Sequence, residues 1–489
     1  MELVPDTLQL DPAVLELGQL FVDAGYELSL VGGPVRDLFL ARTSPDMDFT
    51  TNATPDQILA VARDWADANW DVGRAFGTIG FRKKRRNQPA LMIEITTYRA
   101  EAYDPDSRKP VVAFGDNLEA DLERRDFRVN AMALRLPSLD LVDPYGGAAD
   151  LAAGILRTPA SPEMSFSDDP LRMMRAARFA SQLGLAVHPD VAAAMTAMAE
   201  RITIISAERV RDELVKLICG AHPRAGIDLL VCTGLAAIVL PEVPALKLET
   251  DEHHRHKDVY QHSLTVLEQA AALETGPDGP VPGPDFVLRF AALMHDVGKP
   301  ATRRFELGGA VSFRHHEAVG AKLTAKRMRT LRFDNDTIKA VSRLVELHMR
   351  FFGYGDSGWT DSAVRRYVTD AGPVLERLHR LTRSDVTTRN QRKADRLSFA
   401  YDDLEERIEA LAAQEELDAI RPDLDGAAIM ELLGIKPGPV VGRAYKHLLE
   451  LRMENGPMAP AEARDSLLAW WTGQPESGAA STNRVEEQA

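Results

Sequence analysis

Hydrophobic and polar positions in the first part of the chain follow both helical and strand-like repeats. Residues 9–24 carry apolar side chains at helical spacing, and Tyr26–Val31 is a short apolar run with a strand-like composition. Residues 79–83 and 91–98 alternate with period two, which predicts a hairpin of two strands. Thr54-Pro55 predicts the start of a helix that reaches about residue 65. This mixture predicts a small α+β head with a mixed sheet.

Helical periodicity dominates after the head. Ser206 predicts an N-cap, residues 286–294 form a strongly apolar helical run, and charged and apolar groups recur at helical spacing further on. The predicted architecture is therefore a head followed by helical parts. They are a head at 1–150, an all-helical neck at 151–248, a histidine-rich helical domain at 249–400, a helical region at 401–475 and a disordered tail at 476–489.

Composition bounds the class of protein. The 489 residues, 45% hydrophobic and 27% charged, are typical of a globular chain with several cores. Two cysteines, Cys219 and Cys232, exclude a disulfide framework and a zinc ribbon. The acidic amino-terminal segment does not resemble a signal peptide, and apolar runs of membrane-spanning length are missing from the sequence. We expect a cytoplasmic protein without a membrane partner.

The net charge of −15 disfavours a nucleic-acid partner, because phosphate contacts require Lys and Arg. Local patches can nevertheless bind RNA on an acidic protein. Arginines recur at a spacing of three from Arg172 to Arg178, and residues 82–86 form a basic run. That run fits a solvated turn as well as an RNA contact, and both interpretations stay open.

The stretch Leu30–Asp48 carries the strongest chemical signal. A strand ends at Gly32-Gly33, where a helix begins, and such a turn lets backbone N–H groups approach a phosphate. Arg36 lies one turn into that helix and adds a guanidinium. Asp46 and Asp48 share one face of the next strand, so they present two carboxylates to divalent cations. The alternative is a Gly-Gly turn followed by a solvated acidic loop.

This stretch resembles the signature of class II tRNA nucleotidyltransferases, the CCA-adding enzymes, and of the related bacterial poly(A) polymerases. The resemblance implies template-independent nucleotidyl transfer in which Mg²⁺ is held by Asp46 and Asp48. By period two, Glu94 faces the same way as Thr96 and is the candidate third carboxylate; the alternative is an exposed strand glutamate.

Two further head segments carry the resemblance. Residues 122–132 are similar to the family motif that contacts the ribose and phosphates of the incoming nucleotide, which implies roles for Arg125, Asp126 and Asn130. The alternative is an ion-pair network on a helix surface. Residues 98–110 resemble the flexible loop needed in the family for the final adenosine, which favours complete CCA addition over the addition of cytidines alone.

Phe166–Ala180 predicts an N-capped amphipathic helix and resembles the motif that replaces a nucleic-acid template with protein. The resemblance implies that Asp169 and Arg172 bind the Watson–Crick edges of CTP and then ATP, with Arg175 and Arg178 beside them. The family usually has Glu before this Asp, whereas this chain has Asp168, which affects the supporting contact. The alternative is a capped helix with surface arginines.

Seven of the twelve histidines lie between residues 253 and 316. A His-Asp pair that ends an apolar helix suggests metal ligation, and the order His, His-Asp, Asp resembles the HD phosphohydrolase superfamily. The implied ligands of a divalent metal, whose identity the sequence does not give, are His262, His295, Asp296 and Asp385, with His316 and His348 for a second site. The sequence leaves open whether this site is active.

The predicted function is therefore addition of C, C and A to the 3′ end of tRNA from CTP and ATP. One alternative is a poly(A) polymerase, and the flexible loop with the Asp169/Arg172 pair argues against it. Another is an HD-domain metal-dependent phosphohydrolase acting on RNA ends or nucleotides, and a third is a non-catalytic tRNA-binding scaffold. The paired carboxylates Asp46 and Asp48 disfavour both. The sequence does not indicate the oligomeric state.

Overall fold

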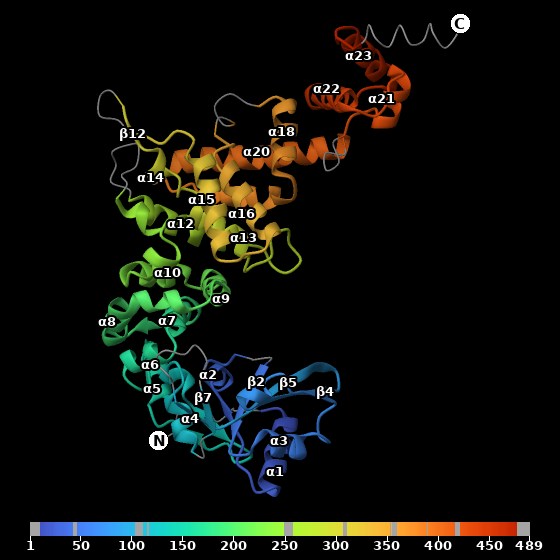
Figure 1. Ribbon diagram of the computed structural model, residues 1–489. Helices are drawn as coiled ribbons and strands as arrows, with labels where there is room; N and C mark the ends of the chain where they lie inside the picture. Colours follow the sequence, from blue (N-terminus) through green and yellow to red (C-terminus); the bar gives the residue numbers. More distant parts are fainter. Residues whose placement is uncertain are drawn as a thin grey trace. The chain divides into compact units, whose positions relative to one another are not determined.

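The chain folds as two units, residues 1–244 and residues 245–489 (Figure 1). The computed structural model describes residues 10–42, 46–102, 111–114, 117–248, 258–306, 311–352, 354, 359–388, 390–415 and 421–476. The predicted five-part division stays a prediction, and one helix, residues 391–415, runs through the predicted boundary at residue 400. No helix in these described ranges is both long and apolar enough to cross a lipid bilayer.

A seven-stranded mixed sheet forms the centre of the head, as the sequence predicts. Its strands are β1 (Ser29–Val31), β2 (Asp46–Thr51), β3 (Ala68–Trp70), β4 (Thr78–Arg85), β5 (Gln88–Thr97), β8 (Ala133–Arg135) and β9 (Leu141–Val142). Their order is β3-β4-β5-β2-β1-β8-β9, and β2 and β5 are parallel while the other neighbours are antiparallel. β6 (Arg99–Ala102) and β7 (Val111–Phe114) form a separate hairpin, and residues 103–110 of the predicted flexible loop lie outside the described part.

Strand alternation gives this sheet one apolar and one polar face. Phe49, Ile79 and Ile93 point into a core that α1 (Pro12–Asp23) and α3 (Pro55–Ala62) cover. A capping box at Thr54 begins α3, which ends three residues before the predicted position. The remaining helices of the head are α2 (Gly33–Phe39), η1 (Arg74–Phe76), α4 (Leu118–Glu123), η2 (Arg128–Asn130) and α5 (Gly147–Ala153).

The neck is helical apart from one two-residue strand pair, β10 (Ile155–Leu156) with β11 (Ala186–Val187). Its helices are α6 (Pro162–Asp168), α7 (Leu171–Leu183), α8 (Pro189–Met198), η3 (Ala199–Ile204), α9 (Ala207–Ile218), α10 (Pro223–Cys232) and α11 (Leu235–Val239). The N-capped helix predicted within residues 166–180 is α7, which begins after Pro170; residues 166–168 belong to the end of α6, and Asp169 between the two helices is extended. Pro170 explains the break, since a proline disfavours helical conformation in the residue before it.

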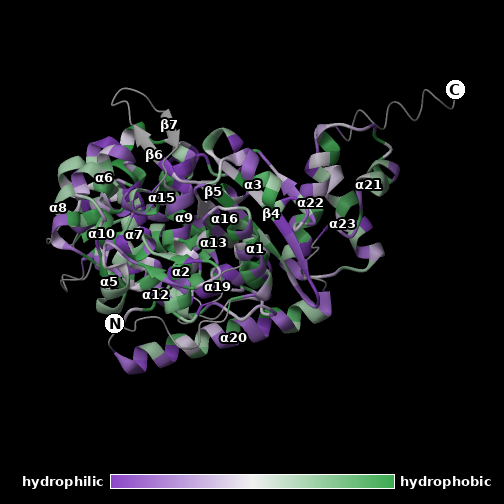
Figure 2. Cartoon of the chain, turned by 90° about the horizontal axis from the view of Figure 1, so that it is seen from below, coloured by the Kyte–Doolittle hydropathy of each residue, from purple (hydrophilic) through white to green (hydrophobic). Residues whose placement is uncertain are grey.

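The second unit is built almost entirely from helices. They are η4 (Pro244–Leu248), α12 (Val259–Ala272), α13 (Phe286–Met294), α14 (Lys299–Thr302), α15 (His316–Thr330), α16 (Asn335–Leu347), α18 (Asp361–Ala371), η5 (Gly372–Val374), α19 (Leu375–Ser384), α20 (Gln391–Glu415), α21 (Gly426–Leu433), α22 (Pro439–Asn455) and α23 (Pro460–Thr472). β12 (Arg304–Phe305) and β13 (Val311–Ser312) form one short hairpin. Helix α20 alternates hydrophilic and hydrophobic residues along its length (Figure 2), with one apolar side buried.

Candidate functional site

The first turn of α2 forms a cradle beneath two guanidinium groups. Gly32 has φ of 75°, a conformation that favours glycine, and a Cβ built on it would lie 3.0 Å from Nη1 of Arg125. A Cβ on Gly33 would lie 3.5 Å from Nη2 of Arg36. The two glycines therefore leave room for cationic side chains directly over the turn, which is the surrounding that a phosphate group requires.

Carboxylates lie next to this cradle on the polar face of the sheet. In the parallel pair β2–β5, Asp48 lies opposite Glu94, and both are exposed. Asp46 lies opposite Met92 in the same pair, and its side chain is outside the described part. Directly paired residues point to the same face, so Asp48 and Glu94 offer oxygen ligands to one small region. Such a donor set fits a hard divalent cation.

A chain of hydrogen bonds joins the cradle to the neck. Arg36 Nη1 donates to Asn130 Oδ1 at 2.7 Å, and Asn130 Nδ2 donates to Asp126 Oδ1 at 2.9 Å. Arg175 Nε then donates to Asp126 Oδ2 at 2.7 Å, and its Nη2 contacts the same oxygen. Three segments far apart in the sequence are thus brought together. Asp126, one of two candidates with Asn130 for a ribose contact, accepts hydrogen bonds from these protein partners.

Asp126 is held as an anion. Burial alone would raise the pKa of this carboxyl, but the Arg175 charge and the hydrogen bond from Asn130 outweigh it and lower the pKa to about 2. Only 7% of the side chain of Asp126 is exposed, so the pair with Arg175 is screened little by solvent. The pair positions Arg175 and Asn130 rather than presenting a carboxylate to solvent.

Phe179, which sequence reasoning missed, lies among three arginines. The guanidinium carbons of Arg178, Arg36 and Arg175 lie 4.3, 5.4 and 5.7 Å from its ring centroid. An aromatic face stabilises nearby cations and spaces like charges. Phe179 falls one helical turn after Arg175, so an aromatic residue at that spacing in an arginine-rich helix was the available signal.

Arg178 turns away from the cradle toward a second missed residue, Glu213. Arg178 Nη1 donates to Glu213 Oε1 at 3.3 Å, and Arg175 Nη1 lies 4.0 Å from the same oxygen. Burial and the neighbouring Arg175 lower the pKa of Arg178 to about 10, so that it stays charged at neutral pH. Glu213 belongs to α9, whose N-cap Ser206 is as predicted, and α9 therefore helps to orient the arginines.

Asp121 is a third missed residue and lies beneath Arg125. Its side chain is only 1% exposed and forms ion pairs with Arg124 at 3.1 Å and Arg125 at 3.3 Å. Burial would raise the pKa of Asp121, but Arg125 and Arg124 lower it. The ion-pair network considered as an alternative is therefore present, but it is anchored on a buried carboxylate and aims Arg125 at Gly32.

Asp169 and Arg172 flank the start of α7. Asp169 Oδ2 accepts from Arg209 Nη2 at 3.0 Å, and its Oδ1 accepts from the backbone N–H of Leu171 at 3.0 Å. Arg172 Nη1 donates to Ser165 Oγ at 2.9 Å, and its Nη2 contacts the carbonyl oxygen of Arg124. Both side chains are thus fixed in place at the junction of head and neck.

The six histidine and aspartate residues singled out in the second unit come together from five segments. They form two groups in which possible ligand atoms lie within 4.8 Å of one another: His262, His295 and Asp385, and Asp296, His316 and His348. The groups adjoin, because His295 Nε2 is 3.3 Å from Asp296 Oδ2 and His316 Nε2 is 3.2 Å from Asp296 Oδ1. Imidazole nitrogens with carboxylate oxygens are a donor set for transition-metal ions.

The outward-facing nitrogens of these histidines have partners suited to metal ligands. Nδ1 of His295, His316 and His348 lies 2.8, 2.9 and 2.6 Å from the carbonyl oxygens of Ala292, Phe313 and Val345. Such a bond holds the proton on Nδ1 and directs the Nε2 lone pair toward the cluster.

Charge in the cluster is consistent with that arrangement. Burial lowers the pKa of His348 to about 4, so its ring is neutral at pH 7. Burial acts in the same direction on His295, but Asp296 and Asp385 raise the pKa of its ring to about 9, and a bound cation would displace that proton. His253, His254 and His256 lie outside the described residues.

Three regions of the chain match models of known protein domains. Residues 28–157 match the poly A polymerase head domain, residues 184–246 match a probable RNA and SrmB-binding site of polymerase A, and residues 259–397 match the HD domain. The chain is 37% identical over 457 residues to an A-adding tRNA nucleotidyltransferase of Deinococcus radiodurans, covering 92% of this chain and 96% of that protein. It is 38% identical over 280 residues to a CCA-adding enzyme of Levilactobacillus brevis, covering 56% and 67%.

Solved structures share the fold. A Bacillus stearothermophilus CCA-adding enzyme in complex with CTP superposes with a TM-score of 0.67 at 23% identity, covering 98% of this chain and 100% of that one. A Thermotoga maritima CCA-adding enzyme complexed with tRNA gives a TM-score of 0.59 at 17% identity, covering 94% and 96%. The order of head, neck and histidine-rich region is thus found in known structures.

Proposed function

Because this chain belongs to the family of tRNA nucleotidyltransferases and poly(A) polymerases, we propose that it adds C, C and A to the 3′ end of tRNA from CTP and ATP. The observation that carries the proposal is the paired register of Asp48 with Glu94 beside the arginine-covered turn at Gly32-Gly33. A binding module has no use for oxygen ligands next to a phosphate cradle.

In the proposed reaction the 3′-hydroxyl of tRNA attacks the α-phosphate of the nucleotide. A bond forms from the 3′-oxygen to phosphorus, the bond to the β-phosphate oxygen breaks, and pyrophosphate leaves. Arg36 and Arg125 hold the phosphates over Gly32 and Gly33, and their charge favours the leaving group. Asp46, Asp48 and Glu94 would hold Mg²⁺, which supplies charge neutralisation at the reacting phosphates.

Base selection falls to Asp169 and Arg172 in this proposal. A carboxylate accepts from the exocyclic amine that cytosine and adenine share, and a guanidinium donates to ring acceptors. The fixed contacts of Asp169 with Arg209 and of Arg172 with Ser165 favour a rigid reader. The arrangement supports selection of CTP and ATP against nucleotides that lack this amine.

Addition of A alone is a second candidate, favoured by one specific observation. One relative, of which this chain covers 96%, is named an A-adding tRNA nucleotidyltransferase. The loop at 98–110 separates complete CCA addition from CC addition, but it does not separate CCA addition from A addition. A poly(A) polymerase differs from both by the length of its product.

The histidine-rich domain supplies a second proposed activity. We infer that His262, His295, Asp296 and Asp385 bind a divalent metal, and that His316 and His348 complete a neighbouring site. Metal-dependent phosphohydrolysis at RNA ends or nucleotides fits this donor set. We also propose a cytoplasmic location, on the cysteine content.

The experiment is Asp46→Ala assayed with CTP, ATP and a tRNA transcript that lacks its 3′ CCA. Incorporation of both nucleotides should fall below detection while tRNA binding stays near that of the unchanged protein. Asp56→Ala, whose side chain is 79% exposed, is the matched control and should incorporate normally. Incorporation by Asp46→Ala would contradict the proposal.

A further inference from the structure

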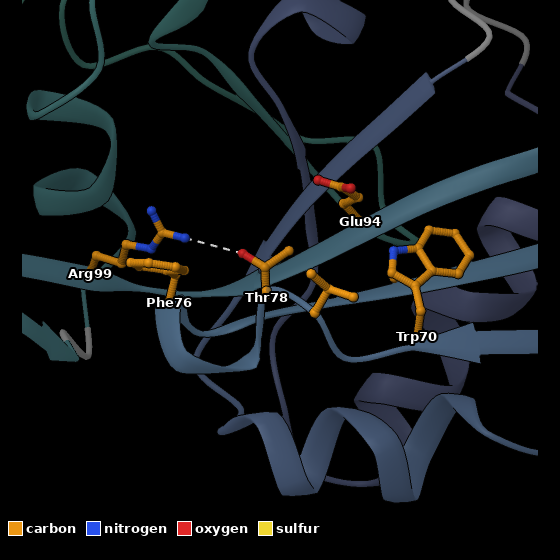
Figure 3. Close-up of a pocket in the computed structure, with 8 residues that line it drawn as sticks. Trp70, Phe76, Thr78, Glu94 and Arg99 are labelled. Atoms are coloured by element: carbon orange, nitrogen blue, oxygen red, sulfur yellow. Dashed lines mark hydrogen bonds between the residues drawn. The ribbon is translucent and has the colours of Figure 1, made fainter. Parts of the chain in front are cut away.

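A groove opens on the polar face of the head, lined mainly by residues of β3, β4 and β5 and the turn before β4. Its cavity has a volume of about 590 Å³, and its walls include Trp70, Phe76, Thr78, Glu94 and Arg99 (Figure 3). Volumes of this order accommodate small organic ligands. In the view of Figure 3 the Glu94 carboxylate lies between Trp70 on one side and Phe76 with Arg99 on the other.

Strand register places the indole of Trp70 in line with the carboxylates. Trp70 pairs with Gly80, Gly80 pairs with Glu94, and Glu94 pairs with Asp48 across four neighbouring strands. Paired residues point to the same face, and strands lie about 4.8 Å apart, so the Cα atom of Trp70 is about 10 Å from that of Glu94 along this row. A Cβ on Gly80 would lie 2.0 Å from the Trp70 ring, so the indole lies over Gly80 of β4.

Aromatic faces and a cation stand together in the groove. Phe76 is 54% exposed although it is a large apolar residue, and Trp70 is half-buried. Arg99 Nη2 donates to Thr78 Oγ1 at 3.1 Å, which keeps its guanidinium at the edge of the groove. Single-stranded RNA is typically bound by aromatic rings that stack on bases and by arginines that meet phosphates.

The geometry of the reaction decides which RNA nucleotide belongs here. In-line transfer requires the attacking oxygen and the leaving pyrophosphate on opposite sides of the α-phosphate. The phosphate cradle follows β1, on one side of β2, whereas Glu94 and the groove lie over β5, β4 and β3 on the other side. The attacking 3′-hydroxyl must therefore approach from the side of the groove.

The side chains of the basic run at 82–86 point to both faces of the sheet, and one of them lies on the face from which the 3′-hydroxyl approaches. Lys83 Nζ lies 4.8 Å from the Trp65 ring centroid, and Arg85 pairs with Asp11 at 2.9 Å, so both serve the helix-covered side. Arg82 is exposed and in register with Met92, which is itself paired with Asp46, on the polar face. A cation thus lies on the same face as the candidate carboxylates.

We propose that this groove binds the 3′-terminal nucleotide of the RNA being extended. Its base stacks against Phe76, its phosphate meets Arg99 on the same side of Glu94, and Trp70 bounds the other side of the groove, which positions the 3′-hydroxyl beside Glu94. This inference rests on the proposed nucleotidyl transfer and adds to it the residues that seat the acceptor. Phe76 and Trp70 are positioning residues that contact the acceptor nucleotide, not the incoming one.

Photocrosslinking tests the placement directly. A tRNA transcript whose 3′-terminal base is 5-iodocytidine is bound to the full chain, irradiated and digested with trypsin. Crosslinks should map to residues 64–74 or 75–82, the tryptic peptides that contain Trp70 and Phe76. Crosslinks confined to other peptides would overturn the inference while leaving nucleotidyl transfer intact.

Kinetics separates acceptor from nucleotide binding. Phe76→Ala should raise the KM for tRNA about tenfold, in the range of lost base stacking, and leave the KM for CTP unchanged. Phe76→Tyr and Trp70→Phe should restore or keep acceptor binding, and the control Val22→Ala, on α1 and 47% exposed, should behave as the unchanged protein. An unchanged KM for tRNA in Phe76→Ala would contradict acceptor binding in the groove. Failure of the unchanged protein to incorporate any nucleotide overturns both proposals.

Discussion

Replacing Asp126 by asparagine should reveal how strongly the neck is fixed to the head. Both oxygens of Asp126 are used: Oδ1 accepts from Asn130 at 2.9 Å and Oδ2 accepts from Arg175 at 2.7 Å. Asparagine keeps the shape but replaces one accepting oxygen by a donating NH₂ group. Asp126→Asn therefore removes the nearest counter-charge of the half-buried Arg175 guanidinium and leaves only Glu213 at 4.0 Å.

The magnitude follows from the pKa and from burial. A fall of the Asp126 pKa from 3.8 to about 2 corresponds to about 2 kcal/mol of stability from ionisation. Removing one partner of a buried ion pair costs about 3–5 kcal/mol, because the remaining charge is left unpaired. Because the Arg175 side chain is 33% exposed, we expect Asp126→Asn to lower the free energy of unfolding by about 2–3 kcal/mol, between the ionisation estimate and the low end of the buried-pair range. For a unit of this size the midpoint temperature should fall by roughly 4–12 °C.

Urea and thermal unfolding of the full chain measure this loss, with Asp56→Asn as the matched control. Asp56 pairs with Arg74 in the same unit, but their side chains are 79% and 46% exposed, so that change should cost less than about 0.5 kcal/mol. The KM values for CTP and ATP should rise together in Asp126→Asn, because Asn130 no longer orients Arg36. An Asp126→Asn protein as stable as the control would refute the reasoning.

Three further outcomes are expected. Gly32→Ala should raise the KM for CTP and ATP together by tenfold or more, because φ of 75° and the guanidinium of Arg125 at 3.0 Å leave no room for a methyl group. Steady-state kinetics with both nucleotides measures the change, and an unchanged KM would exclude a phosphate cradle at this turn. His316→Ala should lower the bound metal, measured by mass spectrometry, while CCA addition stays within about twofold; unchanged metal content would remove His316 from the site. The stability difference between Asp126→Asn and the unchanged protein should be full above pH 5 and should shrink as the pH falls from about 4 to about 2, because the native contacts that lower the pKa of Asp126 stabilise only its ionised form. Chemical unfolding across this pH range measures the difference, and a difference independent of pH would contradict the assigned pKa.

Local patterns in the sequence were sufficient to predict a mixed sheet, four of its strands (β1, β2, β4 and β5) and much of the cradle. The strand at 26–31, the two glycines and the helix start at Gly33 follow from short-range rules, and Asp46 begins the next strand as expected. Period two also placed Glu94 on the polar face, where the structure sets it opposite Asp48. The order of histidines and aspartates in the sequence also predicted the six candidate ligands that lie close together in the second unit.

Contacts between segments that are distant in the chain could not be predicted from the sequence. Asp121 and Glu213 are buried acids whose arginine partners belong to the predicted site, and burial cannot be read from charge alone. The pair of Asp126 with Arg175 joins residues 49 positions apart, which local sequence patterns do not reveal. The start of α7 after Pro170 agrees with the prediction, because a proline disfavours helical conformation in the residue before it.

Product length after addition to a tRNA transcript lacking its 3′ CCA tests the central claim most directly. Purified protein is given Mg²⁺ with CTP, with ATP and with both, and products are resolved to single nucleotides. The account predicts two additions with CTP alone, and a third addition followed by a stop when ATP is also present. A single adenosine added only to tRNA that already ends in CC would assign A addition. A long ladder of adenosines, or no incorporation, would contradict CCA addition.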